Sequence, residues 1–145
     1  MRRVLILLMS LLLAGVGGCA AVAVGPDDVI IVTQSHTTVA GPQSRTDVTV
    51  TRDRAVFETT RFTPGTPTPS PSRSVRALTP AERERIEREA SRAFGQLPER
   101  RQPACTDTGA VSITIESGGR RQSRSVDDCG EAGRPVHDLV ATIRG

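Results

Sequence analysis

The sequence contains no Trp or Tyr, and three Phe residues are its only large aromatic side chains. It also lacks Lys and Asn, so all 19 of its Lys and Arg positions are Arg. Proteins that bind single-stranded nucleic acids stack bases on aromatic side chains, and this composition argues against such a surface. The arginines are scattered along the chain rather than clustered, which is typical of codon bias in a GC-rich genome.

An excess of positive charge is also lacking once the first residues are set aside. The whole chain carries 19 Arg against 16 acidic residues. Arg2 and Arg3 lie in a segment that we expect to be removed, which leaves a side-chain net charge of about +1. Binding of nucleic acid needs a clear excess of positive charge on one face. We therefore expect no nucleic-acid partner.

The N-terminus has the three parts of a secretory signal. Two arginines precede an apolar run from Val4 to Val16 that only Ser10 interrupts, and small residues follow. A peptidase requires such small residues at its cleavage site. The pattern predicts export of the rest of the chain.

The end of this signal, Val16-Gly17-Gly18-Cys19, resembles the lipobox of bacterial lipoproteins. The resemblance implies that residues 1–18 form a signal peptide cleaved after Gly18. It also implies that the thiol of Cys19 receives a lipid and that the new N-terminus is acylated, for example with palmitate. The protein would then be held at the cell membrane or the outer membrane by Cys19, with its domain on the extracytoplasmic side.

Two alternatives fit the same residues. Ala20–Val24 extends the apolar run to about 20 residues, which is long enough for a single uncleaved membrane span. Gly15, Gly17 and Gly18 disfavour that helix, since each costs about 1 kcal/mol relative to Ala. An ordinary signal peptide would instead release a soluble secreted protein.

Two cysteines remain besides Cys19. An even pair in an exported domain predicts a disulfide between Cys105 and Cys129. Closing a loop of about 25 residues would stabilise the fold by roughly 3 kcal/mol. The alternative is a catalytic or metal-binding pair.

The mature chain is expected to consist of a tether over 19–28 and a single small domain over 29–145. Short β-branched segments between Val29 and Thr60 predict a three-stranded antiparallel meander. Residues 63–74 contain four prolines, which predicts an extended loop or linker that forms neither strand nor helix. Glycosylation of this segment and binding of a partner module to it are alternatives to a simple spacer.

A helix is predicted to follow this linker. Thr79 and Glu82 form a capping box with Pro80 at the first helical position, and Gly95 is the expected stop after Phe94. Apolar residues at helical spacing predict one buried face, and the charged residues from Glu82 to Glu89, with Arg83 among them, are assigned to the solvated opposite face.

A β-hairpin and a closing helix complete the predicted fold. Gly118-Gly119 forms the turn between strands at 111–116 and 121–126, which places Val111 opposite Val126 and Cys129 opposite Thr108. Pro135 begins a short helix with an apolar stripe. The fold class is therefore α+β: a small antiparallel sheet made of the meander and the C-terminal hairpin, with a central amphipathic helix and a short C-terminal helix.

This order of elements is similar to that of small bacterial domains of the emfourin type. The shared features are Phe94 at the helix end, the sequence Cys105-Thr106-Asp107 and a closing helix. The resemblance implies an inhibitor of metallopeptidases, although no inhibitory residue can be carried over.

Few residues point to catalysis. His137 lies near Asp127, Asp128 and Cys129 in the sequence, which would suit a metal cluster, a Cys-His pair or a weak hydrolase. Zinc sites use tighter and repeated ligand spacings, and Ser117-Gly118-Gly119 is typical of a hairpin turn. We therefore assign no catalytic residue, no metal ligand and no cofactor, and give His137 a surface or capping role.

The function expected from the sequence is that of a lipid-anchored envelope lipoprotein, and not of an enzyme. Its domain is expected to be a non-catalytic binding or structural module with an envelope protein as partner. Inhibition of an envelope peptidase is one alternative. A secreted or single-span anchored protein of unknown activity is the other.

Overall fold

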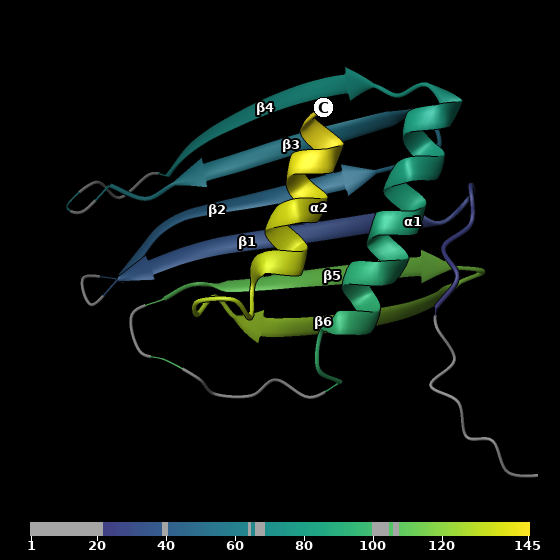
Figure 1. Ribbon diagram of the computed structural model, residues 1–145. Coiled ribbons are helices and arrows are strands. Elements are labelled where there is room, and N and C mark those ends of the chain that lie inside the picture. The colour runs from purple at the N-terminus through teal and green to yellow at the C-terminus, as the bar shows by residue number, and fades with distance from the viewer. Residues whose placement is uncertain (1–21, 39–40, 64, 66–68, 100–104, 106–107) are drawn as a thin grey trace, which may run out of the picture.

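The computed structural model describes residues 22–38, 41–63, 65, 69–99, 105 and 108–145. The signal segment, Cys19, Thr106 and Asp107 lie outside the described residues. The described chain forms an α+β fold with six strands and two helices (Figure 1). In chain order these are β1 (Val29–Thr38), β2 (Gly41–Val50), β3 (Arg54–Arg61), β4 (Ser70–Ala77), α1 (Pro80–Gln96), β5 (Ala110–Ser117), β6 (Arg120–Asp127) and α2 (Arg134–Arg144).

All six strands belong to one antiparallel sheet in the order β4-β3-β2-β1-β5-β6. The C-terminal hairpin joins the meander by pairing β5 with β1, so that Ile30 lies opposite Ile115. The predicted register of the hairpin is confirmed, since Val111 pairs with Val126. Gly118 and Gly119 have φ angles of 54° and 78°, which is the left-handed conformation that a two-residue turn of this kind requires.

The sheet has one strand more than expected, because β4 begins at Ser70 inside the predicted 63–74 linker. The expectation that no strand forms there was wrong. β4 is an edge strand that pairs only with β3, and Pro71 lies opposite Thr60 near its start. Proline is tolerated on an edge strand, where a missing N–H need not interrupt a ladder.

Helix α1 begins as the sequence predicts and ends slightly later. The Thr79 hydroxyl accepts from the Glu82 N–H, and the Glu82 carboxylate accepts from the Thr79 N–H at 2.8 Å. The helix runs through Gly95 to Gln96 and is capped by Leu97. The prediction that the helix stops at Gly95 was therefore wrong.

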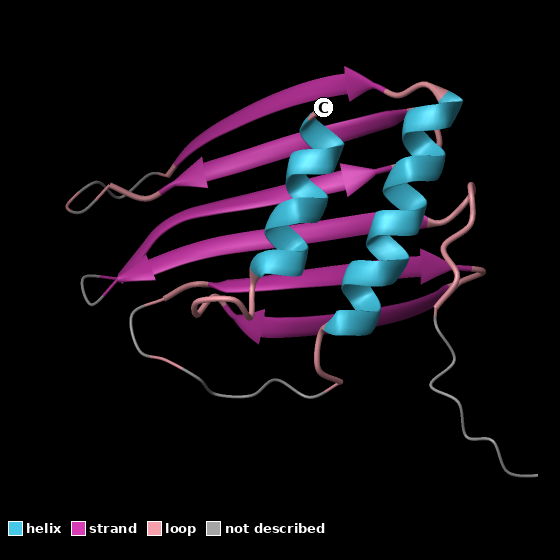
Figure 2. Cartoon of the chain, in the orientation of Figure 1, coloured by secondary structure: helices cyan, strands magenta, loops and turns pink. Residues whose placement is uncertain are grey.

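Both helices lie on the same face of the sheet (Figure 2). A helix of 17 residues is about 25 Å long, which matches the width of six strands spaced about 4.8 Å apart. Helix α1 accordingly spans the sheet from the β4 edge to the β6 edge, and α2 packs beside it. The core between helices and sheet contains mainly aliphatic side chains, including Ile30, Val32, Val48, Val50, Ile86, Phe94, Val111, Ile113, Ile115, Val136, Leu139 and Ile143.

Arg83 is buried, contrary to its predicted place on the solvated face of α1. Its side chain is 3% exposed and forms an ion pair with Glu87. Its guanidinium also donates to the carbonyl oxygens of Thr51, Gly25 and Asp28, at 3.3, 3.0 and 2.8 Å. A buried charge is tolerated when it is paired and its N–H groups are satisfied, and Arg83 meets both conditions.

The segment before β1 is part of the fold. Val22 and Val24 pack against the core, and the Val24 N–H donates to the Ser91 hydroxyl of α1 at 3.2 Å. Together with the bonds from Arg83, these contacts hold residues 22–28 along α1. The tether predicted over 19–28 therefore reaches the packed domain at Val22.

Candidate functional site

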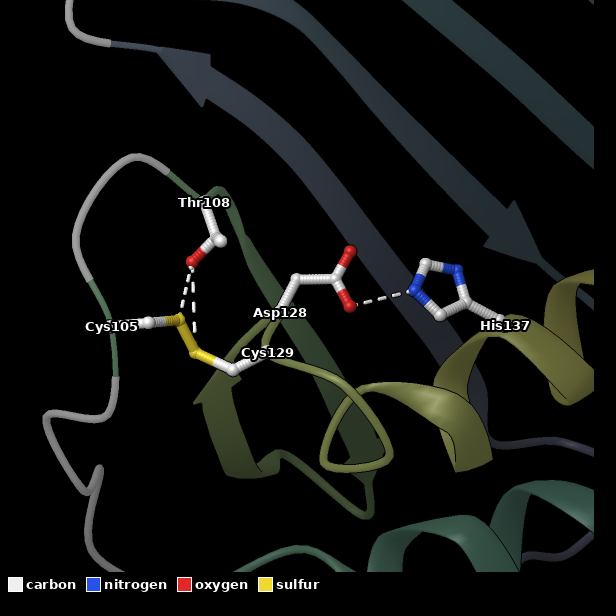
Figure 3. Close-up of a disulfide and its surroundings, with 5 residues drawn as sticks. All are labelled: Cys105, Thr108, Asp128, Cys129 and His137. Atoms are coloured by element: carbon white, nitrogen blue, oxygen red, sulfur yellow. Dashed lines mark hydrogen bonds and ion pairs between the residues drawn. A yellow bond between two sulfur atoms is a disulfide. The ribbon is translucent and has the colours of Figure 1, made fainter.

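The two cysteines of the domain come together at the open end of the β5–β6 hairpin. Cys105 and Cys129 are at disulfide distance, with Cα atoms 6.3 Å apart, and Figure 3 shows their sulfurs joined. The Thr108 hydroxyl lies 2.8 Å from the Cys105 sulfur and 3.7 Å from that of Cys129. This agrees with the predicted placement of Cys129 beside Thr108. The link closes the hairpin where its strands would otherwise separate.

His137 lies close to this disulfide and connects three parts of the fold (Figure 3). Its Nε2 is 2.8 Å from the Asp128 carboxylate, which follows β6. Its Nδ1 is 2.8 Å from the side-chain amide of Gln34 on β1. We call the set Gln34, Asp128 and His137 the histidine latch, because it joins α2 to the sheet and to the loop after β6.

The latch depends on a glycine at the start of α2. Gly133 is the residue before the helix, and its φ of −82° is open to any residue. A Cβ at this position would nevertheless clash with the Asp128 carboxylate and crowd His137 Nε2. Glycine is therefore needed at position 133 because the side chains of Asp128 and His137 pack close to it, and not because the backbone has an unusual conformation.

The hydrogen bonds of the latch limit its chemistry. When the Gln34 amide N–H donates to Nδ1, the ring proton is on Nε2 and is donated to Asp128. Both ring nitrogens of His137 are then occupied. A general base needs a free nitrogen within reach of the proton that it removes, and in this arrangement both ring nitrogens already have a partner.

Asp127 and Ser117, two other candidates from the sequence, are not among the three residues that define the latch. Asp127 is buried at the end of β6, directly before Asp128. Ser117 is exposed at the other end of β5, beside the hairpin turn. Among the described residues, no group of three or more His, Cys, Asp or Glu is arranged to hold a metal ion.

The face of the sheet opposite the helices carries a row of mostly β-branched side chains. Cross-strand pairing aligns Val75 with Val56, Val56 with Thr49, and Thr49 with Ile31. Val75 is 56% exposed and is the one large hydrophobic residue exposed among those described. No described helix packs on this face, and Ile31, Thr49 and Val56 are partly exposed.

A polar cluster lies beside this row. The Arg45 guanidinium donates to both oxygens of Asp47, at 2.8 and 3.0 Å, and these hydrogen bonds with the opposite charge raise the pKa of Arg45. The Thr33 hydroxyl donates to Asp47 at 2.6 Å. Arg45 and Asp47 lie two positions apart on β2, whereas the contact of Asp47 with Thr33 depends on the pairing of β1 with β2, which local patterns in the sequence do not reveal.

Comparison with protein-family models gave no match to this chain, and comparison with curated proteins gave none either. Neither of the two helices that the structure describes has the length and apolar composition of a membrane span.

Proposed function

We propose that this protein is a lipid-anchored lipoprotein of the bacterial cell envelope, with Cys19 as the lipidated residue. The observation that carries the proposal is the sequence Val16-Gly17-Gly18-Cys19 directly after a charged and apolar signal segment. Two or three acyl chains would hold the protein firmly, because each buried methylene contributes about 0.8 kcal/mol and a single chain gives only marginal binding.

The cysteine pair of the domain supports an extracytoplasmic location. Disulfides persist in oxidising compartments and are rare in the cytosol. Cys105 and Cys129 lie at disulfide distance, and Cys19 is left for the lipid.

The role of the domain is non-catalytic: it binds or supports another component of the envelope, with a protein as the favoured partner. The histidine latch supports this assignment, because hydrogen bonds to Asp128 and Gln34 occupy both ring nitrogens of His137. The accessible β-branched row on the sheet leaves a surface on which a partner can be bound.

Metabolic labelling with palmitate tests the anchor. Cells that produce the wild-type protein should incorporate label into it and retain it in the membrane fraction, whereas Cys19→Ala should abolish both. The matched control is the double variant C105A/C129A, which should keep its label because Cys19 is intact. Unchanged labelling and membrane retention of Cys19→Ala would refute the proposal.

A further inference from the structure

The fold begins very close to the proposed anchor. Residues from Val22 onward are held on the domain by the packing of Val22 and Val24, by the hydrogen bond from Val24 to Ser91, and by the bonds from Arg83 to Gly25 and Asp28. The chain therefore has little freedom to move away from α1 after Val22.

The distance between anchor and domain is correspondingly short. Val22 is three positions after Cys19 in the sequence. A fully extended chain gains at most about 3.6 Å per residue, so three residues span no more than about 11 Å. This step rests on the proposed function: if Cys19 carries the lipid, Val22 must remain within that distance of the bilayer surface.

The anchored segment marks one end of the domain. In Figure 1, residues 22–28 lie at the right, at the end where β5 finishes and β6 begins. Pairing agrees with this view, because Val29 lies opposite Glu116, next to the hairpin turn 117–120. The disulfide lies at the other end of β6, which is eight residues long, or about 25 Å away.

Basic and acidic side chains both lie at the anchored end, where Asp27 pairs with Arg52 and two arginines have no such partner in the described part of the chain. Arg120 is exposed at the hairpin turn, and Arg88 is exposed on α1, one turn before Ser91. Among the described residues neither of these arginines has an ion-pair partner, whereas Arg121 pairs with Glu116. Basic residues held near a membrane are attracted to anionic lipid headgroups.

We propose that the domain rests on the bilayer in one orientation, with the hairpin turn 117–120 and Arg88 against anionic lipid headgroups. The disulfide and the histidine latch then lie on the side that faces away from the membrane. The anchor thus orients the domain, because only Cys19, Ala20 and Ala21 separate the lipid from Val22 and this short chain determines which end of the domain contacts the bilayer.

Fluorescence quenching in vesicles tests this orientation. The full-length lipidated protein, purified from membranes, is reconstituted in vesicles that contain anionic phospholipid and lipid with a nitroxide on its headgroup. A dye is attached to a thiol introduced at the anchored end by Ser117→Cys or at the far end by Glu131→Cys; both positions are exposed. We expect at least threefold stronger quenching at position 117, and equal or stronger quenching at position 131 would overturn the proposal.

Two further variants test whether the short chain before Val22 and the two arginines determine this orientation. Insertion of ten Gly and Ser residues between Ala21 and Val22 should lower quenching at position 117 at least twofold, because the longer chain releases the domain. The double variant R88Q/R120Q should lower it in anionic vesicles and leave it nearly unchanged in zwitterionic ones. Unchanged quenching after the insertion would contradict positioning by the anchor, and unchanged quenching of the double variant in anionic vesicles would contradict the headgroup contact.

Failure of this inference is distinguishable from failure of the proposed function. A protein that lacks palmitate label refutes lipidation at Cys19. A labelled protein whose two dye positions are quenched equally leaves lipidation intact and refutes the orientation.

Discussion

Arg83 on α1 donates a hydrogen bond of 2.8 Å to the carbonyl oxygen of Asp28, which lies 55 positions earlier in the chain. The same guanidinium nitrogen also donates to the Gly25 carbonyl oxygen. One buried side chain thus joins the central helix to the segment that leads to the proposed anchor. Arg83 is therefore central both to the stability of the domain and to the placement of its N-terminus.

Replacement of Arg83 should be strongly destabilising. Arg83→Met leaves Glu87, which is only 14% exposed, without its partner and removes the donors to three backbone carbonyls. Removal of one member of a buried ion pair costs about 3 kcal/mol or more. Urea unfolding of the mature domain measures this loss. The matched control is Arg88→Met on the exposed face of α1, which should change the free energy of unfolding by less than about 0.5 kcal/mol; equal effects of the two substitutions would contradict the buried role of Arg83.

The sequence predicted those parts of the fold that depend on local patterns. The alternation of apolar and polar residues in β5, together with the Gly118-Gly119 turn, was enough to predict the register of the hairpin. The capping box of Thr79 and Glu82 was enough to predict the start of α1. These features involve residues close in sequence, whose geometry follows from turn and capping chemistry.

Features that depend on long-range packing were missed. The burial of Arg83 arises from carbonyl groups of the chain before β1 and after β2, which helical periodicity cannot reveal. β4 was missed because its proline is acceptable only at a sheet edge, and the position of an edge is a property of the whole sheet. Asp128 and His137 are close in the sequence. The arrangement of their side chains also depends on Gly133 and on Gln34, which lies 103 positions from His137.

Loss of the disulfide should lower stability without changing the fold. The double variant C105S/C129S removes a link between residues 24 positions apart, and loss of a loop of this size costs about 3 kcal/mol. Denaturant unfolding with and without reductant measures the effect. Reductant should destabilise the wild type to about the level of the double variant and leave the variant itself unaffected. A wild type that is insensitive to complete reduction would contradict the stabilising role.

The histidine latch should appear as an energetic coupling between its members. A double-mutant cycle with Asp128→Ala and His137→Ala isolates their interaction from other effects. Because these side chains are 28% and 46% exposed, we expect a coupling of about 0.5 kcal/mol. Gly133→Ala should remove most of that coupling, since its Cβ would clash with the carboxylate. Strict additivity of the two alanine substitutions would show that the latch contributes nothing.

Stability should fall at acidic pH partly through Glu82. Hydrogen bonds from the Thr79 backbone N–H and hydroxyl lower the pKa of Glu82 below its ordinary value of 4.5, and Arg76 lowers it further. A carboxyl whose pKa is depressed in the folded state stabilises the protein above its unfolded-state pKa. That contribution is lost as pH falls through the lower, folded-state pKa.

Unfolding from about pH 6 to about pH 3 measures this dependence. Glu82→Gln should flatten the loss of stability on the acidic side, whereas Glu84→Gln, which changes an exposed residue of the same helix, should leave it unchanged. Identical pH profiles for the wild type and Glu82→Gln would contradict the capping role of this carboxylate.

Intact-mass spectrometry of the natural protein, extracted from the cells that produce it, tests the central claim most directly. The account predicts a chain that begins at Cys19, carries the added mass of its acyl chains, and contains Cys105 and Cys129 as an oxidised pair. A chain that retains Met1, carries no lipid and has both of these thiols free would contradict it.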